Sequence, residues 1–154
     1  MQIQIIDWEE SVAKMARKLE AGAVAVEETA PVFGAIATDM FRVEKAIFSS
    51  QGRRFGGSWK YLAESTRLKK GHPVILVDTG DLRRSVTEPG AEFQILQIDR
   101  FGIDFGTHRP WAFVHQFGDK RGHVPKRQFI DFNQRDLLRW TDMLFDHLLR
   151  PFRT

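Results

Sequence analysis

The histidines are the first residues whose type could support chemistry, because imidazole binds metal ions and transfers protons. The chain has 5 histidines, which are His72, His108, His115, His123 and His147. None has the His-x-x-x-His or Glu-x-x-His spacing that places two metal ligands on one helix face. His115 with Asp119 and His123 could form a metal site, but a histidine at a helix end is more often hydrogen-bonded to the backbone. We therefore predict no metal site.

Nucleophiles and phosphate-binding loops give no stronger candidate. The chain has no Cys, which excludes disulfides, thiolate metal sites and a thiol nucleophile. Ser58 and Ser85 lack the context of a nucleophile elbow. No Gly-rich loop follows a strand and opens a helix in the manner of a phosphate site. We predict that the protein is not an enzyme and has no catalytic or cofactor-binding residue.

One short motif could still do acid–base chemistry. Val77-Asp78-Thr79-Gly80 resembles the active-site signature of the aspartic proteases, in which two close carboxylates share a proton. A retropepsin-like chain would supply Asp78 and dimerise to supply the second carboxylate. Such enzymes are almost entirely strand and loop, whereas this chain has three long helical patterns and a charged segment directly after the motif. A three-residue motif also matches often by chance, so this is the least favoured hypothesis.

The segment from Ser49 to His72 is basic and rich in glycine. It carries six basic residues against Glu64 alone, and three aromatic residues lie among them: Arg53, Arg54, Lys60, Arg67, Lys69 and Lys70, with Phe55, Trp59 and Tyr61. Basic and aromatic side chains together can bind nucleic acid. A solvated loop that packs Trp59 and Leu62 back on the core, or that contacts another protein, is favoured over this. We predict a mobile basic loop at about residues 50–72.

Composition limits the remaining classes. The chain has 154 residues, of which 42% are hydrophobic, with 13 Phe and 4 Trp, so one domain covering residues 1–154 with a real core is expected. The net charge of +3 is modest, which by itself is weak support for nucleic-acid binding. No apolar run reaches the ~20 residues of a membrane span, and no secretion signal is recognised at the N-terminus.

Three helical patterns frame the chain. Asp7 could cap a first helix, whose apolar stripe is expected in the core: Val12, Met15, Leu19, Ala23 and Val26. A second helix should follow Pro31, with a stripe of Phe33, Ile36, Met40, Val43 and Ile47. The last should begin near Asp131 or Asn133, present a broad apolar face and end at Pro151.

The middle of the chain predicts a small sheet. Val74–Val77 should form a buried strand that breaks at the fold-defining turn of Asp78, Thr79 and Gly80 into a short helix, which one of the polar residues there could cap. Further strands are expected at 93–98 and 103–105, and Val86-Thr87 could join them. A short helix is expected between Pro110 and Gly118, and an extended segment at 124–130. The predicted fold is α+β: a small, mostly antiparallel sheet flanked by two N-terminal helices and a C-terminal helix.

Several of these pieces together resemble the phage virion-morphogenesis family of tail-completion, neck and head–tail joining proteins. They are Phe48-Ser-Ser followed by Gly57-Ser-Trp-Lys-Tyr-Leu62, Thr66-Arg-Leu-Lys69, Ile75-Leu-Val-Asp-Thr-Gly-Asp-Leu-Arg-Arg-Ser-Val86, Trp111-Ala-Phe-Val-His-Gln-Phe-Gly118 and Val124-Pro-Lys-Arg-Gln-Phe-Ile130. No single motif is specific, but their order and spacing are, over residues 48–130. Three positions depart from the family pattern: Trp111 replaces Tyr, Gln128 replaces Pro and Ile130 replaces Leu.

The resemblance implies a structural protein of a tailed phage or prophage. Such proteins form rings, commonly hexamers, at the head–tail joint, and DNA passes through the lumen. The expected partners are further copies of the chain, neighbouring connector, stopper or tail-tube proteins, and nearby genomic DNA, with no membrane. The expected location is the virion neck or the head-proximal tail end, and the host cytoplasm during assembly.

Two alternatives remain open: a tail-terminator ring that caps the tail tube, and a small basic nucleic-acid-binding protein. For a ring subunit we predict partner contacts in the basic loop and in the segment around Pro125. The candidate residues are Arg53, Arg54, Phe55, Trp59, Tyr61, Lys69, Lys70, Pro125, Arg127 and Phe129.

Overall fold

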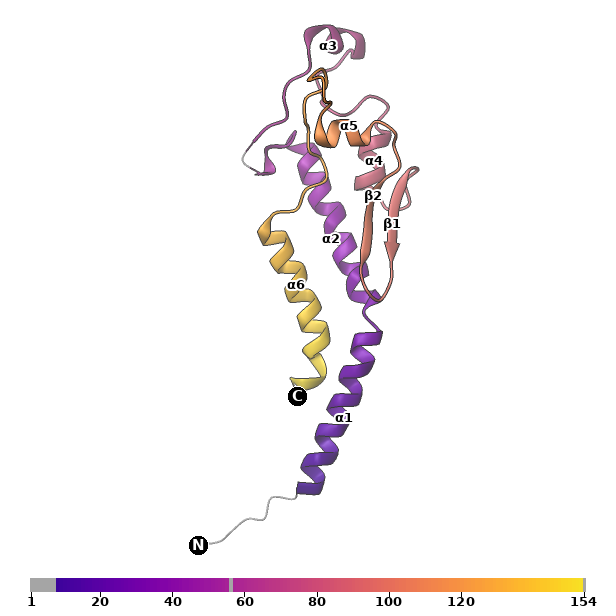
Figure 1. The fold of residues 1–154 in the computed structure, drawn as a ribbon, viewed down its shortest axis with the longest axis vertical. Helices are drawn as coiled ribbons and strands as arrows, with labels where there is room; N and C mark the ends of the chain where they lie inside the picture. The colour runs from indigo at the N-terminus through magenta and orange to yellow at the C-terminus, as the bar shows by residue number, and fades with distance from the viewer. Residues whose placement is uncertain (1–7, 56, 154) are drawn as a thin grey trace.

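The computed structural model describes residues 8–55 and 57–153 of the chain, without the side chains of residues 8, 9 and 55. The elements, in chain order, are α1 (Trp8–Glu27), α2 (Ala30–Ser49), the 3₁₀ helix η1 (Arg53–Phe55), α3 (Glu64–Lys70), α4 (Asp81–Thr87), β1 (Gln94–Ile98), β2 (Ile103–Thr107), α5 (Ala112–Phe117), α6 (Gln134–Leu149) and the 3₁₀ helix η2 (Arg150–Phe152). Figure 1 shows α2 as a central spine, with α6 along one side and the β1–β2 hairpin along the other.

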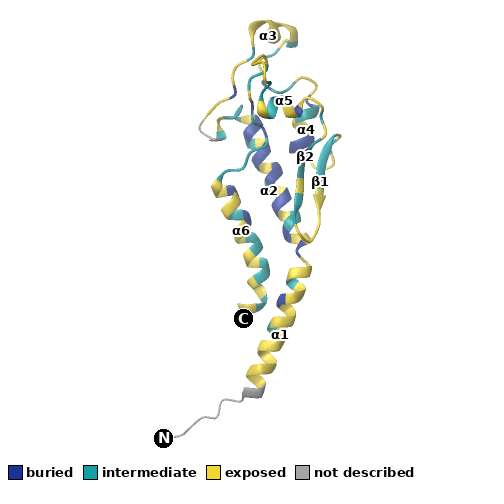
Figure 2. Cartoon of the chain, in the orientation of Figure 1, coloured by how far each residue is buried: buried dark blue, intermediate teal, exposed yellow. Residues whose placement is uncertain are grey.

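The predicted second helix supplies most of the core. Pro31 lies in its first turn, where a missing N–H costs nothing. Ile36, Met40, Val43 and Ile47 are buried as predicted, and Figure 2 shows the buried residues concentrated on α2. They meet Val86 of α4, Trp140 of α6, and Trp59, Ile75 and Phe129 from the connecting segments. The spine is therefore covered from several sides by short pieces of chain.

The predicted first helix forms, but its expected role in the core is wrong. Val12, Met15, Leu19 and Val26 are between 55% and 58% exposed, and Ala23 is exposed as well. The reason is the placement of the helix: α1 continues beyond the ends of α6 and the hairpin (Figure 1), so none of the described elements covers most of its length. The predicted cap at Asp7 lies outside the described residues.

The sheet is smaller than expected. β1 and β2 form a two-stranded antiparallel hairpin in register from Gln94↔Thr107 to Ile98↔Ile103, which confirms two of the predicted strands and the α+β class. The predicted strand at 74–77 is wrong, because Leu76 adopts a left-handed φ of 58°, and the N–H of Ile75 donates to Oε1 of Gln51 at 2.8 Å rather than to a neighbouring strand. The expected extension at 86–87 lies in α4 instead.

The helix ends follow local chemistry. Gly80 precedes α4 with a φ of 87°, a left-handed conformation that suits glycine. Among the predicted caps, only Thr79 accepts an α4 N–H, that of Asp81, at a long 3.4 Å. Asn133 begins α6 with a reciprocal capping box to Asp136. α6 ends at Leu149, and Pro151 lies in the 3₁₀ turn that follows.

Buried ion pairs join α6 to α2 and to the basic loop. Asp136, whose side chain is 1% exposed, accepts from Arg54 at 2.6 Å and from Arg139 at 2.9 Å. Arg139 also pairs with Asp39 of α2, which accepts from the indole N–H of Trp140 at 2.7 Å. Burial alone would raise the pKa of both aspartates, but the hydrogen bonds outweigh it and lower both values.

Glu44 of α2 lies beside this network without an equivalent partner. It is fully buried, and neither carboxylate oxygen accepts a hydrogen bond of good geometry from the described residues. Burial raises the pKa of Glu44 to about 9, and the backbone of Asp131 and the charge of Arg54 offset this only in part. The side chain is therefore neutral at physiological pH.

Substitution Asp136→Ala should lower the free energy of unfolding by about 3–5 kcal/mol, because it removes the buried carboxylate that Arg54 and Arg139 share and half of the capping box. Asp142→Ala, at an exposed position of the same helix, is the matched control and should change it by less than about 0.5 kcal/mol. Urea unfolding followed by circular dichroism measures both. Equal stability of the two variants would contradict the structural role of the network.

Substitution Glu44→Gln should change how stability depends on pH. In the wild type, folding raises the pKa from 4.5 to about 9, so the folded state holds an extra proton between these values, and stability falls as pH rises toward 9, by up to about 1.4 kcal/mol per pH unit.

The effect of Glu44 on stability is best measured between pH 7 and 9. The lowered pKa of His115 has the opposite effect on stability, but only below its ordinary value of 6.5. Glu44→Gln should flatten the decline between pH 7 and 9 and leave the variant more stable than the wild type at pH 8.5. Glu92→Gln, at an exposed position, should keep the wild-type slope. A wild-type stability that is flat from pH 7 to 9 would refute the buried-proton interpretation.

Candidate interaction surface

Trp59 and Phe129, two of the predicted contact residues, lie in the core. Trp59 is 6% exposed and Phe129 1% exposed, and their rings pack on Phe48 with centroids 5.3 Å and 6.1 Å away. The indole N–H of Trp59 donates to the Gln128 carbonyl at 2.8 Å. The ring covers Gly52, where an added Cβ would lie 2.5 Å from it. The basic loop is thus anchored at Trp59, as the packing alternative predicted.

Three predicted basic contacts bind within the chain. Arg127 is buried, which lowers its pKa, and it donates to the carbonyls of Lys60 at 3.0 Å and Tyr61 at 3.3 Å. Arg54 pairs with Asp136, and Lys70 donates to the Val74 carbonyl at 2.8 Å. These cations hold the loop in place, and in the isolated chain much of their charge is directed inward.

The other candidates face solvent. Tyr61 is 76% exposed, Arg53 and Lys69 are exposed, and Pro125 is half-buried. α3, the helix that carries Lys69, has no buried residue. The side chain of Phe55 lies outside the described part. Contact of any of these residues with a second protein stays a prediction, and the exposed ones are the best placed for it.

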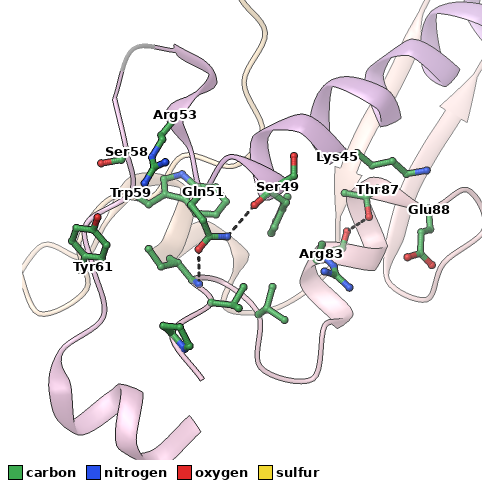
Figure 3. Close-up of a pocket in the computed structure, with 15 residues that line it drawn as sticks. Lys45, Ser49, Gln51, Arg53, Ser58, Trp59, Tyr61, Arg83, Thr87 and Glu88 are labelled. Atoms are coloured by element: carbon green, nitrogen blue, oxygen red, sulfur yellow. Dashed lines mark hydrogen bonds between the residues drawn. The ribbon is translucent and has the colours of Figure 1, made fainter. Parts of the chain in front are cut away.

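Two open grooves border the loop. One, of about 610 Å³, lies between the loop and α4, and Figure 3 shows Lys45, Arg53 and Arg83 around it, with Gln51 bridging Phe48 and Ile75. The other, of about 1160 Å³, separates the loop from α5, and Tyr61, Trp111 and Arg127 line it. Both grooves are open and lined by apolar, basic and a few acidic side chains, a mixture that suits a protein partner better than a small substrate.

Sequence reasoning missed the exposed aromatic surface of α5. Trp111 is 73% exposed, Phe113 70% and Phe117 61%, and the two Phe rings pack against each other with centroids 4.8 Å apart and a tilt of 50° between them. The sequence carried only a partial signal: Phe113 and Phe117 are four residues apart and so share one face of α5, with Trp111 just before the helix, but this spacing does not say whether the face is covered. Such clusters on a protein surface mark contact sites.

The residues considered for catalysis or metal binding are not brought together. Asp78 is exposed, and neighbouring Asp81 is occupied by Arg84 at 2.5 Å and by Arg109. Across residues 8–55 and 57–153, no three potential metal ligands of the His, Asp or Glu type converge. The expected backbone bond of His115 is absent at Nδ1, which is buried without a partner among the described residues.

Comparison with known proteins decides the family. The model of the phage virion morphogenesis family matches residues 7–149. The chain belongs to the phage virion morphogenesis family. A protein of Haemophilus influenzae (strain ATCC 51907 / DSM 11121 / KW20 / Rd) named "Mu-like prophage FluMu G protein 2" is 31% identical over 123 residues, which cover 77% of each chain. No solved structure matches.

Family membership gives this virion morphogenesis protein a structural role in phage assembly and associates it with the virion. None of the described helices combines the length and apolarity that a bilayer crossing requires. The protease hypothesis for Asp78 depended on a fold made almost entirely of strands, and the described chain is mainly helical.

Many of the residues that carry the family resemblance hold the molecule together. Gln116 of α5 accepts from the N–H groups of Phe129 and Ile130 at 3.0 and 3.1 Å and donates to the Ile130 carbonyl at 2.7 Å. Ser85, fully buried, bonds to Thr107 of β2 at 2.8 Å. These motif residues fasten α4 to β2 and α5 to the 124–130 segment.

Substitution Arg127→Met keeps the length and apolar stem of the side chain but removes both hydrogen bonds to the loop. Hydrogen exchange measured by mass spectrometry should then be at least tenfold faster across residues 60–70, with α2 unchanged, because the loop loses its anchor to the 124–130 segment. Lys126→Met, at the exposed neighbouring position, should exchange like the wild type. Unchanged exchange in Arg127→Met would show that the Arg127 hydrogen bonds do not hold the loop.

Proposed function

We propose that this protein is the repeating subunit of a ring, commonly a hexamer in this family, at the head–tail joint of a tailed phage or prophage. DNA would pass through the lumen of the ring. The observation that carries the proposal is exposed apolar surface on three separate elements: α1, α5 and α6 each present large hydrophobic side chains to solvent. A subunit with neighbours on several sides needs such surfaces, whereas a monomeric protein rarely exposes them.

The extent of the surface supports the same conclusion. The chain exposes 11101 Å², whereas a compact monomer of 17.8 kDa would expose about 8,000 Å². The excess comes from an elongated shape (Figure 1), in which α1 and the basic loop lie at opposite ends. Copies in a ring would cover part of this surface, and connector, stopper or tail-tube proteins above and below would cover more.

A tail-terminator ring at the end of the tail tube is the close alternative, because it would use the same kinds of surface. Immunogold labelling of intact and tailless particles distinguishes the two by the position of the protein. A nucleic-acid-binding role is supported by the exposed Arg53, Lys60 and Lys69, but Arg54, Lys70 and Arg127 are engaged within the chain. That role predicts DNA affinity that falls steeply with salt.

The exposed part of the basic loop should be required for joining heads to tails. Deleting 53–57 would be a poor test, because it removes Arg54 and so disturbs the ion pair with Asp136. The double variant Tyr61→Ala/Lys69→Glu changes only exposed side chains. Supplied to a phage or prophage that lacks its own copy of the gene, it should yield free heads and free tails in negative-stain images, with infectivity reduced at least a hundredfold.

The control is Arg135→Glu, which reverses a charge at an exposed position of α6 and should restore joined particles. Circular dichroism should show that both variants are folded. If the chain without Tyr61 and Lys69 joined heads to tails normally, the loop would not be the contact. If the gene could be deleted without loss of joining, the proposed function itself would be wrong.

A further inference from the structure

The larger of the two open grooves carries a surplus of positive charge. This groove of about 1160 Å³ between the basic loop and α5, which we call the α5 groove, is lined by five basic and two acidic residues: Lys60, Lys69, Lys70, Arg109 and Arg127, with Asp78 and Asp81. Asp81 is already paired with Arg84 and Arg109. With that pair set aside, four lining cations face Asp78 alone, and none of the four forms an ion pair with a carboxylate of the described residues.

Three basic groups of the α5 groove lie close enough to influence one another. Burial, together with the positive charges of Arg127 and Lys70, lowers the pKa of His115. Burial also lowers the pKa of Lys70, which the charge of Asp78 opposes and that of Arg127 reinforces. Nδ1 of His115 is buried without a hydrogen-bond partner among the described residues. An anion in the groove would relieve this repulsion, because an opposite charge nearby stabilises each cation.

The sides of the α5 groove are apolar and aromatic. Tyr61 of the basic loop is 76% exposed, and Trp111, just before α5, is 73% exposed. Aliphatic side chains also line the groove: Leu62, Leu76, Val77, Val124 and Pro125. Its volume exceeds the ~300–1,000 Å³ of small-molecule pockets. An occupant that fills it is therefore larger than a small molecule and combines negative charge with apolar groups.

Two kinds of polymer meet that description, single-stranded nucleic acid and an acidic polypeptide. A nucleic acid stacks its bases on aromatic rings but carries a phosphate at every step of its backbone, so Asp78 and Asp81 within the groove would repel it. A polypeptide can place its carboxylates beside the lysines and its apolar side chains elsewhere along the groove. The mixed lining of the α5 groove therefore favours the polypeptide.

We propose that the α5 groove binds an extended acidic segment of a neighbouring virion protein, whose carboxylates lie beside Lys60, Lys69 and Lys70. The apolar side chains of that segment pack between Tyr61 and Trp111. This inference rests on the proposed function, because it specifies the chemistry of the partner that a head–tail joining protein holds in this groove.

Selection from a library of random peptides displayed on yeast tests this chemistry without assuming a sequence. With the purified chain as bait, the recovered peptides should contain Asp and Glu at least twice as often as the starting library, together with a large apolar residue. A recovered peptide, made synthetically and followed by fluorescence anisotropy, should bind more weakly as salt is raised, because salt screens exposed charges.

Two charge-reversal variants localise the binding. Lys60→Glu/Lys69→Glu reverses two exposed cations of the α5 groove and should weaken binding of the synthetic peptide at least tenfold. Lys45→Glu/Arg53→Glu makes the same change of charge at exposed positions of the other groove and should bind like the wild type. Circular dichroism should show that both variants are folded.

His115 reports whether the peptide lies inside the α5 groove. The carboxylates of the bound peptide should raise the pKa of His115, because they offset the charges of Arg127 and Lys70. Nuclear magnetic resonance of the imidazole protons across a pH series measures this, and His115→Gln identifies the signal. A peptide of the same length with Lys in place of each Asp and Glu should cause no such rise.

Several outcomes overturn the proposal. It is wrong if no peptide is recovered, if the recovered peptides are not acidic, if Lys60→Glu/Lys69→Glu binds them as tightly as the wild type, or if the pKa of His115 does not rise. Tighter binding of a poly-dT oligonucleotide in the same groove would make it a nucleic-acid site. Self-association that Lys60→Glu/Lys69→Glu abolishes would make the occupant a second copy of this chain. Either result overturns the proposal as well.

The peptide measurements and the joining of heads to tails can fail separately. If acidic peptides bind in the α5 groove but the gene is not needed for joining, the proposed function is wrong and the binding of an acidic segment stands. If the gene is needed for joining but the groove shows no preference for acidic peptides, the function stands and this inference is wrong.

Discussion

The buried ion pairs of Asp136 are the interaction on which the rest of the molecule depends. A carboxylate that is 1% exposed is tolerated only because two guanidinium groups and the start of α6 satisfy it. Those partners come from different places: Arg139 links α6 to Asp39 of α2, and Arg54 belongs to the basic loop. One residue thus sets the register of α6 on the spine and brings the loop against the core.

The basic loop is anchored at a second point, where polar groups that lie inside the protein again form hydrogen bonds with one another. Trp59 and Arg127 each give hydrogen bonds to carbonyl groups of a segment distant in sequence, and Gln116 fixes the 124–130 segment to α5. Since the sheet of the described residues is a two-stranded hairpin, these side-chain bonds replace the strand ladders that would otherwise join the segments. Ser85, Gln116 and Arg127 thus serve the packing of the chain, although many other polar residues of the motifs are exposed.

The small size of the core also explains why large apolar side chains are exposed. Among the described helices, α2 has a buried face along its whole length, and the short elements around it cannot also cover α1, the outer face of α6 and the aromatic residues of α5. Leaving apolar surface open is costly for a monomer but suits a subunit whose neighbours are added during assembly. Stability of the fold and the capacity to assemble therefore come from different faces of the same helices.

Much of the secondary structure could be predicted from the sequence. The stripe of α2, the hairpin strands and the cap at Asn133 depend on local spacing and on residues a few positions apart, and so does the helix between Pro110 and Gly118. The order of four motifs was sufficient to indicate the virion morphogenesis family. What the sequence left open was which side chains lie inside.

The tertiary structure decided which side chains are buried. The stripe of α1 has the periodicity of a core helix, but periodicity records only that one face is apolar and not what covers it. Val74–Val77 has the composition of a strand, but the N–H of Ile75 bonds to Gln51, 24 residues earlier, a contact that no local pattern contains. Arg54, Trp59 and Arg127 resembled surface contacts because basic and aromatic residues are usual there, and only their long-range partners turned them inward. By itself the sequence determined the elements and the family; the pairing of distant polar groups, which depends on the whole chain being folded, decided which surfaces remain for a partner.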